Sequence, residues 1–246
     1  KLGGEREVVP VGVSVGLKPT DEELHEQVQG YIEDGYARVK IKIKPGRDIE
    51  MLAGLRERFP DIAFMADANS AYSLADVDKL RELDALGLMM IEQPLSYNDF
   101  LDHARLQAQI ETPVCLDESI KSEGDLALAL HLGSCRIVNV KPGRVGGFAV
   151  SRRIHDTMRL EGLPVWCGGM LESGVGRAHN VALASLPGFT LPGDISASQR
   201  YWHRDIVSPE FEVADGVMKV PTGPGLGVEL DLDRIHGLTV REESFG

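Results

Sequence analysis

The sequence has few of the features that mark secreted, membrane or nucleic-acid-binding proteins. It contains three cysteines and no CxxC pair, so neither a disulfide framework nor a cysteine-based zinc or iron–sulfur site is indicated. Basic residues are scarce, because 26 Lys and Arg face 38 Asp and Glu and the net charge is -12 at pH 7. Nucleic acid and anionic membranes attract the opposite balance, so we expect neither as a partner.

Long apolar runs and familiar nucleotide-binding motifs are missing as well. No stretch approaches the roughly 18 apolar residues of a membrane span, and no signal peptide is visible. There is no Walker or GxGxxG sequence, and His103, His131 and His155 form no HxxxH or HExxH pair, so we interpret these histidines as structural. With cysteines that match a reducing compartment, the sequence predicts a cytoplasmic protein.

Five charged residues recur about every 25 positions, each at or near the end of a short apolar run. We call Lys42, Asp67, Glu92, Asp117 and Lys141 the strand-end set. One strand plus one helix takes about 25 residues in a parallel β/α array, and 246 residues suit one barrel of this α/β class. Because active residues of such barrels lie at the carboxyl ends of the strands, the five side chains are expected to meet.

The hydrophobic periodicity predicts seven or eight strands that alternate with helices. Strands are expected over residues 9–17, 38–44, 88–94, 113–117, 136–141, 164–170 and 189–195, with one more that ends near Asp67. Helices are expected over residues 48–58, 98–109, 146–160 and 177–185, with others capped by Thr20, Ser73 and Ser122. From residue 208 a Pro/Gly-rich pattern predicts an extended tail. We therefore expect a barrel over 1–207 and a C-terminal extension over 208–246.

Basic and apolar residues alternate strictly in the segment 38–44. In isolation this pattern is typical of an exposed antiparallel edge strand. Within a β/α array the apolar face must meet the helices, so Lys40 and Lys42 are expected to point into the barrel. Interior lysines are costly unless they do chemistry. We expect Lys40, one layer deeper, to neutralise nearby acids and to tune Lys42.

Asp67, Glu92 and Asp117 end three consecutive predicted strands, so their carboxylates are expected to converge. Three ionised carboxylates in one site need a compensating positive charge. Oxygen ligands without Cys or His beside them favour Mg²⁺, with Mn²⁺ or Co²⁺ as substitutes. The alternative for any single acid is a helix cap or a pair with a surface lysine.

Lys42 and Lys141 flank the acids in strand order and are candidate bases. An amine beside other cations loses its proton more readily, and a divalent ion can stabilise the enediolate formed when a C–H next to a carboxylate is deprotonated. Two bases on opposite faces of one carbon suit racemisation, whereas one base with a β-leaving group suits syn dehydration. Each lysine has the alternative role of a salt-bridge partner.

Further polar contacts are expected around this set. Asn69 and Asn139 share the inward faces of their strands. A glycine-rich turn follows the segment 164–170, and its backbone N–H groups are candidates for holding a substrate carboxylate at a helix N-terminus. The glycines of this turn are Gly168, Gly169, Gly174 and Gly176, and a simple tight turn is an equal alternative for them. Gly169, Met170, Glu172 and Ser173 are expected to be supporting or substrate-binding residues.

The motifs KIK, DAN, EQP, DES and VKPGRVGG together resemble the enolase superfamily in its muconate-lactonising-enzyme-like subgroup. In particular, the chain is similar to the o-succinylbenzoate synthase / N-succinylamino acid (N-acylamino acid) racemase family. The resemblance implies a modified TIM barrel, (β/α)₇β, with Mg²⁺ on the three acids and catalysis by Lys42 and Lys141. It also implies a small carboxylate substrate, a homo-oligomer and, for the synthases, a role in menaquinone biosynthesis.

The resemblance also implies an N-terminal capping domain that closes over the active site, and we expect that domain to be missing from this sequence. The first residue is Lys1, not Met, so we expect the chain to begin within a larger protein. The extension 208–246 would pack towards the missing domain. The alternatives are another muconate-lactonising-type lyase or racemase, a Schiff-base aldolase using Lys42 or Lys141, and a catalytically silent barrel fragment.

Overall fold

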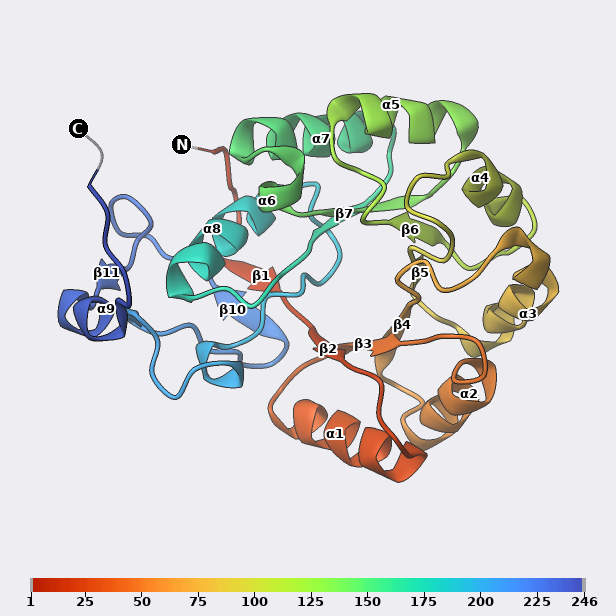
Figure 1. The fold of residues 1–246 in the computed structure, drawn as a ribbon, viewed down its shortest axis with the longest axis horizontal. Coiled ribbons are helices and arrows are strands. Elements are labelled where there is room, and N and C mark those ends of the chain that lie inside the picture. The colour runs from red at the N-terminus through yellow and green to blue at the C-terminus, as the bar shows by residue number, and fades with distance from the viewer. Residues whose placement is uncertain (1, 245–246) are drawn as a thin grey trace.

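The computed structural model of the chain describes residues 2–244. Its centre is a parallel sheet of seven strands, each paired with the next in sequence order (Figure 1). The strands are β2 (Val13–Val15), β3 (Arg38–Lys42), β4 (Ala63–Asp67), β5 (Ile91–Glu92), β6 (Val114–Leu116), β7 (Ile137–Val140) and β8 (Val165–Cys167). All seven run in the same direction, so their carboxyl ends gather at one end of the curled sheet.

Helices connect the strands and form a ring around the sheet (Figure 1). They are α1 (Asp21–Glu33), α2 (Ile49–Arg58), α3 (Val77–Arg81) between the 3₁₀ turns η1 (Leu74–Asp76) and η2 (Glu82–Leu86), α4 (Leu101–Gln107), α5 (Glu123–Leu132), α6 (Pro142–Val145), α7 (Phe148–Leu160) and α8 (Gly174–Ala184). The predicted caps are confirmed: Thr20 and Ser122 accept N–H bonds in the first turns of α1 and α5, and Ser73 forms a capping box with Asp76. The alternation of strands and helices confirms the predicted modified TIM barrel.

The strand β3 presents its two faces as the alternation predicts. Val39 and Ile41 are buried in the main apolar core with helix residues, whereas Arg38 and Lys40 are buried inside the barrel. There both cations lie over the indole ring of Trp166, at 5.5 and 5.1 Å from its centroid. The basic face of this strand therefore points inward, and the edge-strand alternative is wrong.

The barrel is closed by an irregular segment where the sequence predicts a strand over 189–195. Gly12 N–H donates to Gly193 O at 2.8 Å, and Asp194 N–H donates to Cys167 O at 2.9 Å, so the segment lies between β8 and the start of the chain. It makes only isolated bridges. Pro192 has no N–H to donate, which prevents a regular ladder here. The prediction of a regular eighth strand is wrong, although the segment occupies its place.

Two other predicted strands differ from the structure. The segment 9–17 splits into β1 (Val8–Pro10) and β2, because β1 turns away to pair antiparallel with β10 (Val217–Lys219). Arg38 packs against Gly12 at the break, where a Cβ would lie 2.3 Å from the Arg38 Nε atom. The segment 88–94 contributes only two residues to β5, because Gln93 takes φ +41° and ends the strand.

The C-terminal part of the chain contains η3 (Ser198–Arg200), β9 (Val207–Ser208), β11 (Glu229–Leu230) and α9 (Leu232–Leu238). β9 pairs antiparallel with β11, and β10 ties this region to β1 (Figure 1). The expectation of a wholly extended tail is wrong at α9, where Asp231 caps the helix by accepting Arg234 N–H at 3.0 Å. The division at residue 208 stays a prediction, and it falls within β9.

The histidines that the sequence marks as structural behave so where they are buried. His103 Nε2 accepts the Leu95 N–H at 3.1 Å, and His155 Nε2 accepts the Gly188 N–H at 2.8 Å. Each ring therefore fastens a loop to a helix, while His131 lies exposed on α5. Across residues 2–244, none of the helices has both the length and the apolar character needed to cross a bilayer.

Candidate active site

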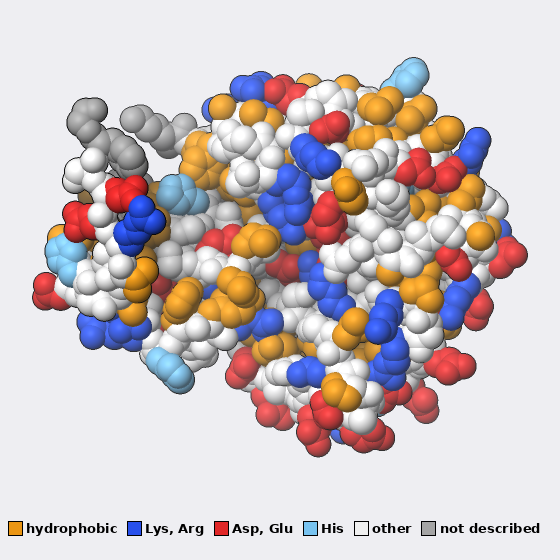
Figure 2. All heavy atoms as spheres, viewed as in Figure 1, with side chains coloured by type: hydrophobic (Ala, Val, Ile, Leu, Met, Phe, Trp, Pro, Cys, Tyr) orange, Lys and Arg blue, Asp and Glu red, His pale blue; other side chains and the backbone are white. Residues whose placement is uncertain are grey.

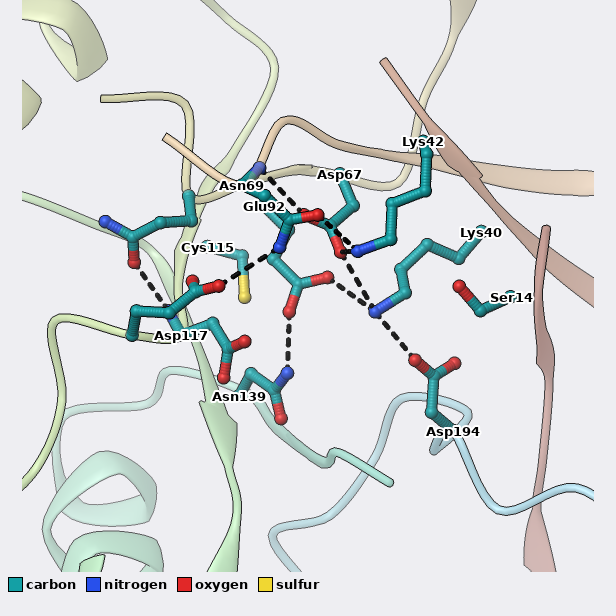
Figure 3. A network of polar contacts seen from close by, with 12 residues as sticks. Ser14, Lys40, Lys42, Asp67, Asn69, Glu92, Cys115, Asp117, Asn139 and Asp194 are labelled. Atoms are coloured by element: carbon teal, nitrogen blue, oxygen red, sulfur yellow. Dashed lines mark hydrogen bonds and ion pairs between the residues drawn. The ribbon is translucent and has the colours of Figure 1, made fainter. Parts of the chain in front are cut away.

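The strand-end set meets at the carboxyl end of the barrel. Lys42, Asp67 and Glu92 are the last residues of β3, β4 and β5, and Asp117 and Lys141 directly follow β6 and β7. The parallel register pairs Lys42 with Asp67 and Asp67 with Glu92, so these side chains leave the sheet at the same height. The predicted convergence is therefore present in the fold, and Figure 3 shows Lys42, Asp67, Glu92 and Asp117 around one point.

Lys40 lies deeper in the barrel and joins three carboxylates. Its Nζ is 2.9 Å from Glu92 Oε2, 3.2 Å from Asp67 Oδ2 and 2.7 Å from Asp194 Oδ2 (Figure 3). Burial lowers the pKa of Lys40, but Asp194, Glu92 and Asp67 outweigh burial and raise it well above its usual range. Lys40 is therefore a fixed ammonium and not a candidate base.

Lys42 is held from two sides and is more accessible than Lys40. Its Nζ donates to Asp67 Oδ2 at 2.6 Å and also to Asn69 Oδ1. The Asn69 side-chain amide in turn donates to Glu118 Oε1 at 3.0 Å. The Lys42 side chain is 30% exposed, against 5% for Lys40. Of the two lysines on this strand face, Lys42 is thus the one that can reach a bound molecule.

Lys141 approaches the acids from β7. Its Nζ donates to Asp117 Oδ2 at 2.8 Å, and Arg144 contacts the other oxygen of the same carboxylate. Asn139, on the same strand, donates its side-chain amide to Glu92 Oε1 at 2.6 Å. Gly168 packs on both, since a Cβ there would lie 2.2 Å from Asn139 Oδ1 and 2.6 Å from Lys141 Cε. A side chain at residue 168 would therefore displace both.

The two candidate bases, Lys42 and Lys141, line one cavity of about 360 Å³. Asp67, Asn69, Gly169 and Met170 also line it, and Figure 2 shows basic and acidic side chains around the hollow in the centre of the helical ring. Two predicted contacts lie elsewhere. Glu172 accepts the Met170 N–H at 2.6 Å and so braces the turn, and Ser173 precedes α8. A substrate-binding role for Glu172 and Ser173 stays a prediction.

Asp194 is a site residue that sequence reasoning missed. Its carboxylate binds Lys40 Nζ and, at 2.6 Å, Arg38 Nη1. Burial by itself would raise the pKa of Asp194, but Lys40 and Arg38 lower it below its usual range. The signal in the sequence was an acid within the apolar segment 189–195, which was expected to form the last barrel strand. Arg144, Glu118 and Ser14 also line the cavity and were not predicted.

Ser14 lies in the sequence GVSVG, which matches the GxSxG pattern of hydrolases. A nucleophile of that type sits on a sharp turn between a strand and a helix. Ser14 instead lies in the middle of β2, and its carbonyl accepts a bond from Arg200 at 2.6 Å. The geometry does not support a serine nucleophile.

Within residues 2–244, the structure contains no group of three His, Cys, Asp or Glu side chains that is arranged to hold a metal ion. The carboxylates of Asp67, Glu92 and Asp117 instead contact lysine ammonium groups at 2.6–3.2 Å. Cations thus already occupy the positions around these oxygens.

The donor set nevertheless fits a hard divalent cation, because it consists of carboxylates without Cys or His ligands. Desolvation, with further contributions from Asp67, Asp117 and Asp194, raises the pKa of Glu92 to about 8 against the opposing charge of Lys40. The buried Glu92 carboxylate therefore needs a neighbouring positive charge to stay ionised. Asn139 Oδ1 is also buried without a hydrogen-bond partner among the described residues.

Gly169 allows the closest backbone contact of the site, and we expect Gly169→Ala to be destabilising. A Cβ there would lie 1.9 Å from the carbonyl oxygen of Asp194. The overlap must be relieved by moving the segment that carries Asp194, which we expect to cost about 1–3 kcal/mol of unfolding free energy in denaturant titrations. Gly143→Ala is the matched control, because a Cβ there meets nothing within 4 Å. Equal stability of the two variants would contradict this reading of the turn.

Fold and site together define a β/α-barrel protein with a lysine-flanked acidic site at the carboxyl ends of its strands. The model of the enolase C-terminal domain-like family matches residues 23–234. The chain belongs to this family.

Its relatives are similar over almost the whole chain. The o-succinylbenzoate synthase of Geobacillus kaustophilus is 54% identical over 238 residues, which cover 97% of this chain and 64% of the relative. The N-succinylamino acid racemase of Amycolatopsis is 55% identical over 229 residues, which cover 93% of this chain and 62% of the relative. The solved structure of an enolase superfamily member from Listeria innocua is 50% identical, with a TM-score of 0.93, and the match covers 96% of this chain and 64% of that one. The chain spans less than two thirds of the length of these relatives.

Proposed function

We propose that this chain is the catalytic barrel of an enzyme that removes a proton α to a carboxylate, through an enediolate, with the help of Mg²⁺. The reaction would be that of an o-succinylbenzoate synthase, of an N-succinylamino acid racemase, or of both. The observation that carries the proposal is that Lys42 and Lys141 line one cavity and each binds a different carboxylate of one acidic cluster.

Asp67, Glu92 and Asp117 are the residues that would hold Mg²⁺, with Mn²⁺ or Co²⁺ as substitutes. When bound, the ion supplies positive charge that favours a substrate carboxylate and the negative charge that develops on it. Binding would release the ammonium groups of Lys42 and Lys141 from Asp67 and Asp117. Lys40 would keep its place below, because Asp194 holds it independently.

Lys42 and Lys141 would exchange the α-proton from opposite sides. Lys42 comes from β3 and Lys141 follows β7, with the three acid-bearing strands between them. In a racemase one amine takes the proton from one face and the other returns it to the opposite face. In a synthase Lys42 would act as the base and assist departure of the β-hydroxyl group, while the Lys141 ammonium would stabilise the enediolate.

The names of the relatives support both reactions, and the shared first step explains why one site serves either. Another muconate-lactonising-type reaction is the alternative. The cytoplasmic location, the homo-oligomer, the role in menaquinone biosynthesis and the packing of residues 208–246 towards a capping domain stay predictions. A capping domain would exclude water from a cavity that is open in this chain.

The test is deuterium exchange at the α-carbon of N-succinylamino acids in D₂O with Mg²⁺, followed by proton NMR. It is run on this chain alone and on a fusion with the part of the Bacillus subtilis synthase that the chain does not match, since the match covers 66% of that relative. We expect exchange in the fusion, and formation of o-succinylbenzoate in a parallel absorbance assay. A folded fusion that shows neither reaction would refute the proposal.

A further inference from the structure

Gln93 directly follows Glu92 and is completely buried. Its backbone takes φ +41°, a left-handed conformation that side chains other than glycine rarely adopt. Asn69 and Ser70, after the neighbouring strand β4, take φ +42° and +65°. Three of the four non-glycine residues with positive φ among those described thus lie beside the acidic cluster. Such conformations persist where the surrounding structure requires them, often at functional sites.

The side chain of Gln93 reaches from the end of β5 to the end of β6. Its Oε1 accepts the backbone N–H groups of Asp117 and Ser119 at 3.0 and 3.3 Å. Its Nε2 donates to Ser119 Oγ at 2.8 Å and to Leu95 O at 3.3 Å. Both the oxygen and the nitrogen of the side-chain amide therefore have hydrogen-bond partners. The amide continues the hydrogen bonding between β5 and β6 beyond the point where their ladder ends.

The backbone of Gln93 extends this connection to both neighbours. Its N–H donates to Cys115 O in β6 at 2.8 Å, and its carbonyl accepts the Ser70 N–H after β4 at 2.8 Å. One residue thus links the strand ends that carry Asp67, Glu92 and Asp117. Glycine would relieve the strained φ but would lose the amide that holds Asp117.

We propose that Gln93 is a positioning residue that fixes the backbone at Asp117, and thereby the third carboxylate, relative to Asp67 and Glu92. The inference rests on the proposed metal-binding role of these acids. Gln93 does not line the cavity, so it would act through the strand ends that it joins, and on Asp117 through the N–H bond to its side chain. Partners of this kind usually change metal affinity by about 10–100-fold when they are removed.

Gln107, in α4, offers a matched control, because its side-chain amide binds the opposite end of β6. It is also buried, and its Oε1 accepts the N–H of Val114, the first residue of β6, at 2.7 Å. Its Nε2 donates to Ile110 O and Thr112 O at 3.3 and 3.4 Å. Two buried glutamine amides therefore satisfy backbone groups at the two ends of β6, but only Gln93 lies at the acidic end.

The experiment compares Gln93→Met with Gln107→Met in the whole chain. Methionine keeps the length of the side chain and removes its hydrogen bonds, so both variants are expected to melt at a lower temperature without metal. Titration calorimetry with MgCl₂ should show about 10–100-fold weaker binding for Gln93→Met and less than twofold change for Gln107→Met. Unchanged affinity in Gln93→Met, or equal loss in both variants, would overturn the inference.

Two further measurements separate the possible failures. If Gln93→Met does not fold, Ser119→Ala removes one anchor of the same amide and should weaken Mg²⁺ binding by roughly 2–5-fold, below the range for the whole side chain. An unchanged affinity there would also overturn the inference. If the unmodified chain binds no Mg²⁺, the proposed metal site itself is wrong, whereas a binding parent with an unaffected Gln93 variant refutes only the role of Gln93.

Discussion

Lys42→Ala is expected to slow α-proton exchange from one enantiomer of an N-succinylamino acid by about 10²–10⁴-fold and to leave exchange from the other nearly intact. The amine of Lys42 enters the cavity from β3, so it can reach only one face of the α-carbon. The measurement is proton NMR of each enantiomer in D₂O with Mg²⁺, in the fusion described above. Asp67 keeps a cationic partner in this variant, because Lys40 Nζ lies 3.2 Å from the same oxygen.

Lys141→Ala should give the mirror-image result, with loss of exchange from the opposite enantiomer. Its acid also keeps a partner, since Arg144 contacts Asp117. Lys44→Ala is the control, because Lys44 lies two residues beyond Lys42 and is exposed. Equal loss for both enantiomers from Lys42→Ala alone would contradict the two-base scheme and would favour a one-base synthase.

Much of this site could be predicted because its residues occupy equivalent places in a repeating unit. A period of one strand plus one helix places Lys42, Asp67 and Glu92 at the same height, and the parallel register of β3, β4 and β5 reproduces that placement. The alternation in β3 likewise predicted that Lys40 is buried. These are consequences of strand geometry, in which successive side chains point to opposite faces.

The residues that were missed depend on contacts between distant parts of the chain. Asp194 lies in a segment where a proline interrupts the hydrogen-bond ladder, so the alternation of side chains along a strand could not predict which way Asp194 points. Gln93 was visible in the motif EQP, but its role follows from a left-handed backbone that no local pattern requires. The split between β1 and β2 has the same origin, since the partner of β1 is β10, about 200 residues away.

Asp117→Asn is expected to weaken Mg²⁺ binding to this chain by roughly 100-fold or more, because loss of a ligand charge exceeds the about 10–100-fold effect of an outer partner. The substitution keeps the shape of the side chain and removes its negative charge. Titration calorimetry with MgCl₂ measures the change directly and does not depend on activity. Lys141 and Arg144 both lose their anionic partner, so α-proton exchange from the face served by Lys141 should fall as well.

Glu118→Gln is the matched control for this prediction. Glu118 is the next residue and has the same kind of charge. It lines the cavity that Lys42 and Lys141 share, and it binds Asn69 instead of a lysine of the strand-end set. A glutamine oxygen can still accept that bond, so Mg²⁺ affinity should stay within a few-fold of the parent. If Asp117→Asn binds Mg²⁺ as tightly as the parent while Glu118→Gln does not, the third ligand belongs to residue 118. Asp117 would then serve to hold Lys141 and Arg144.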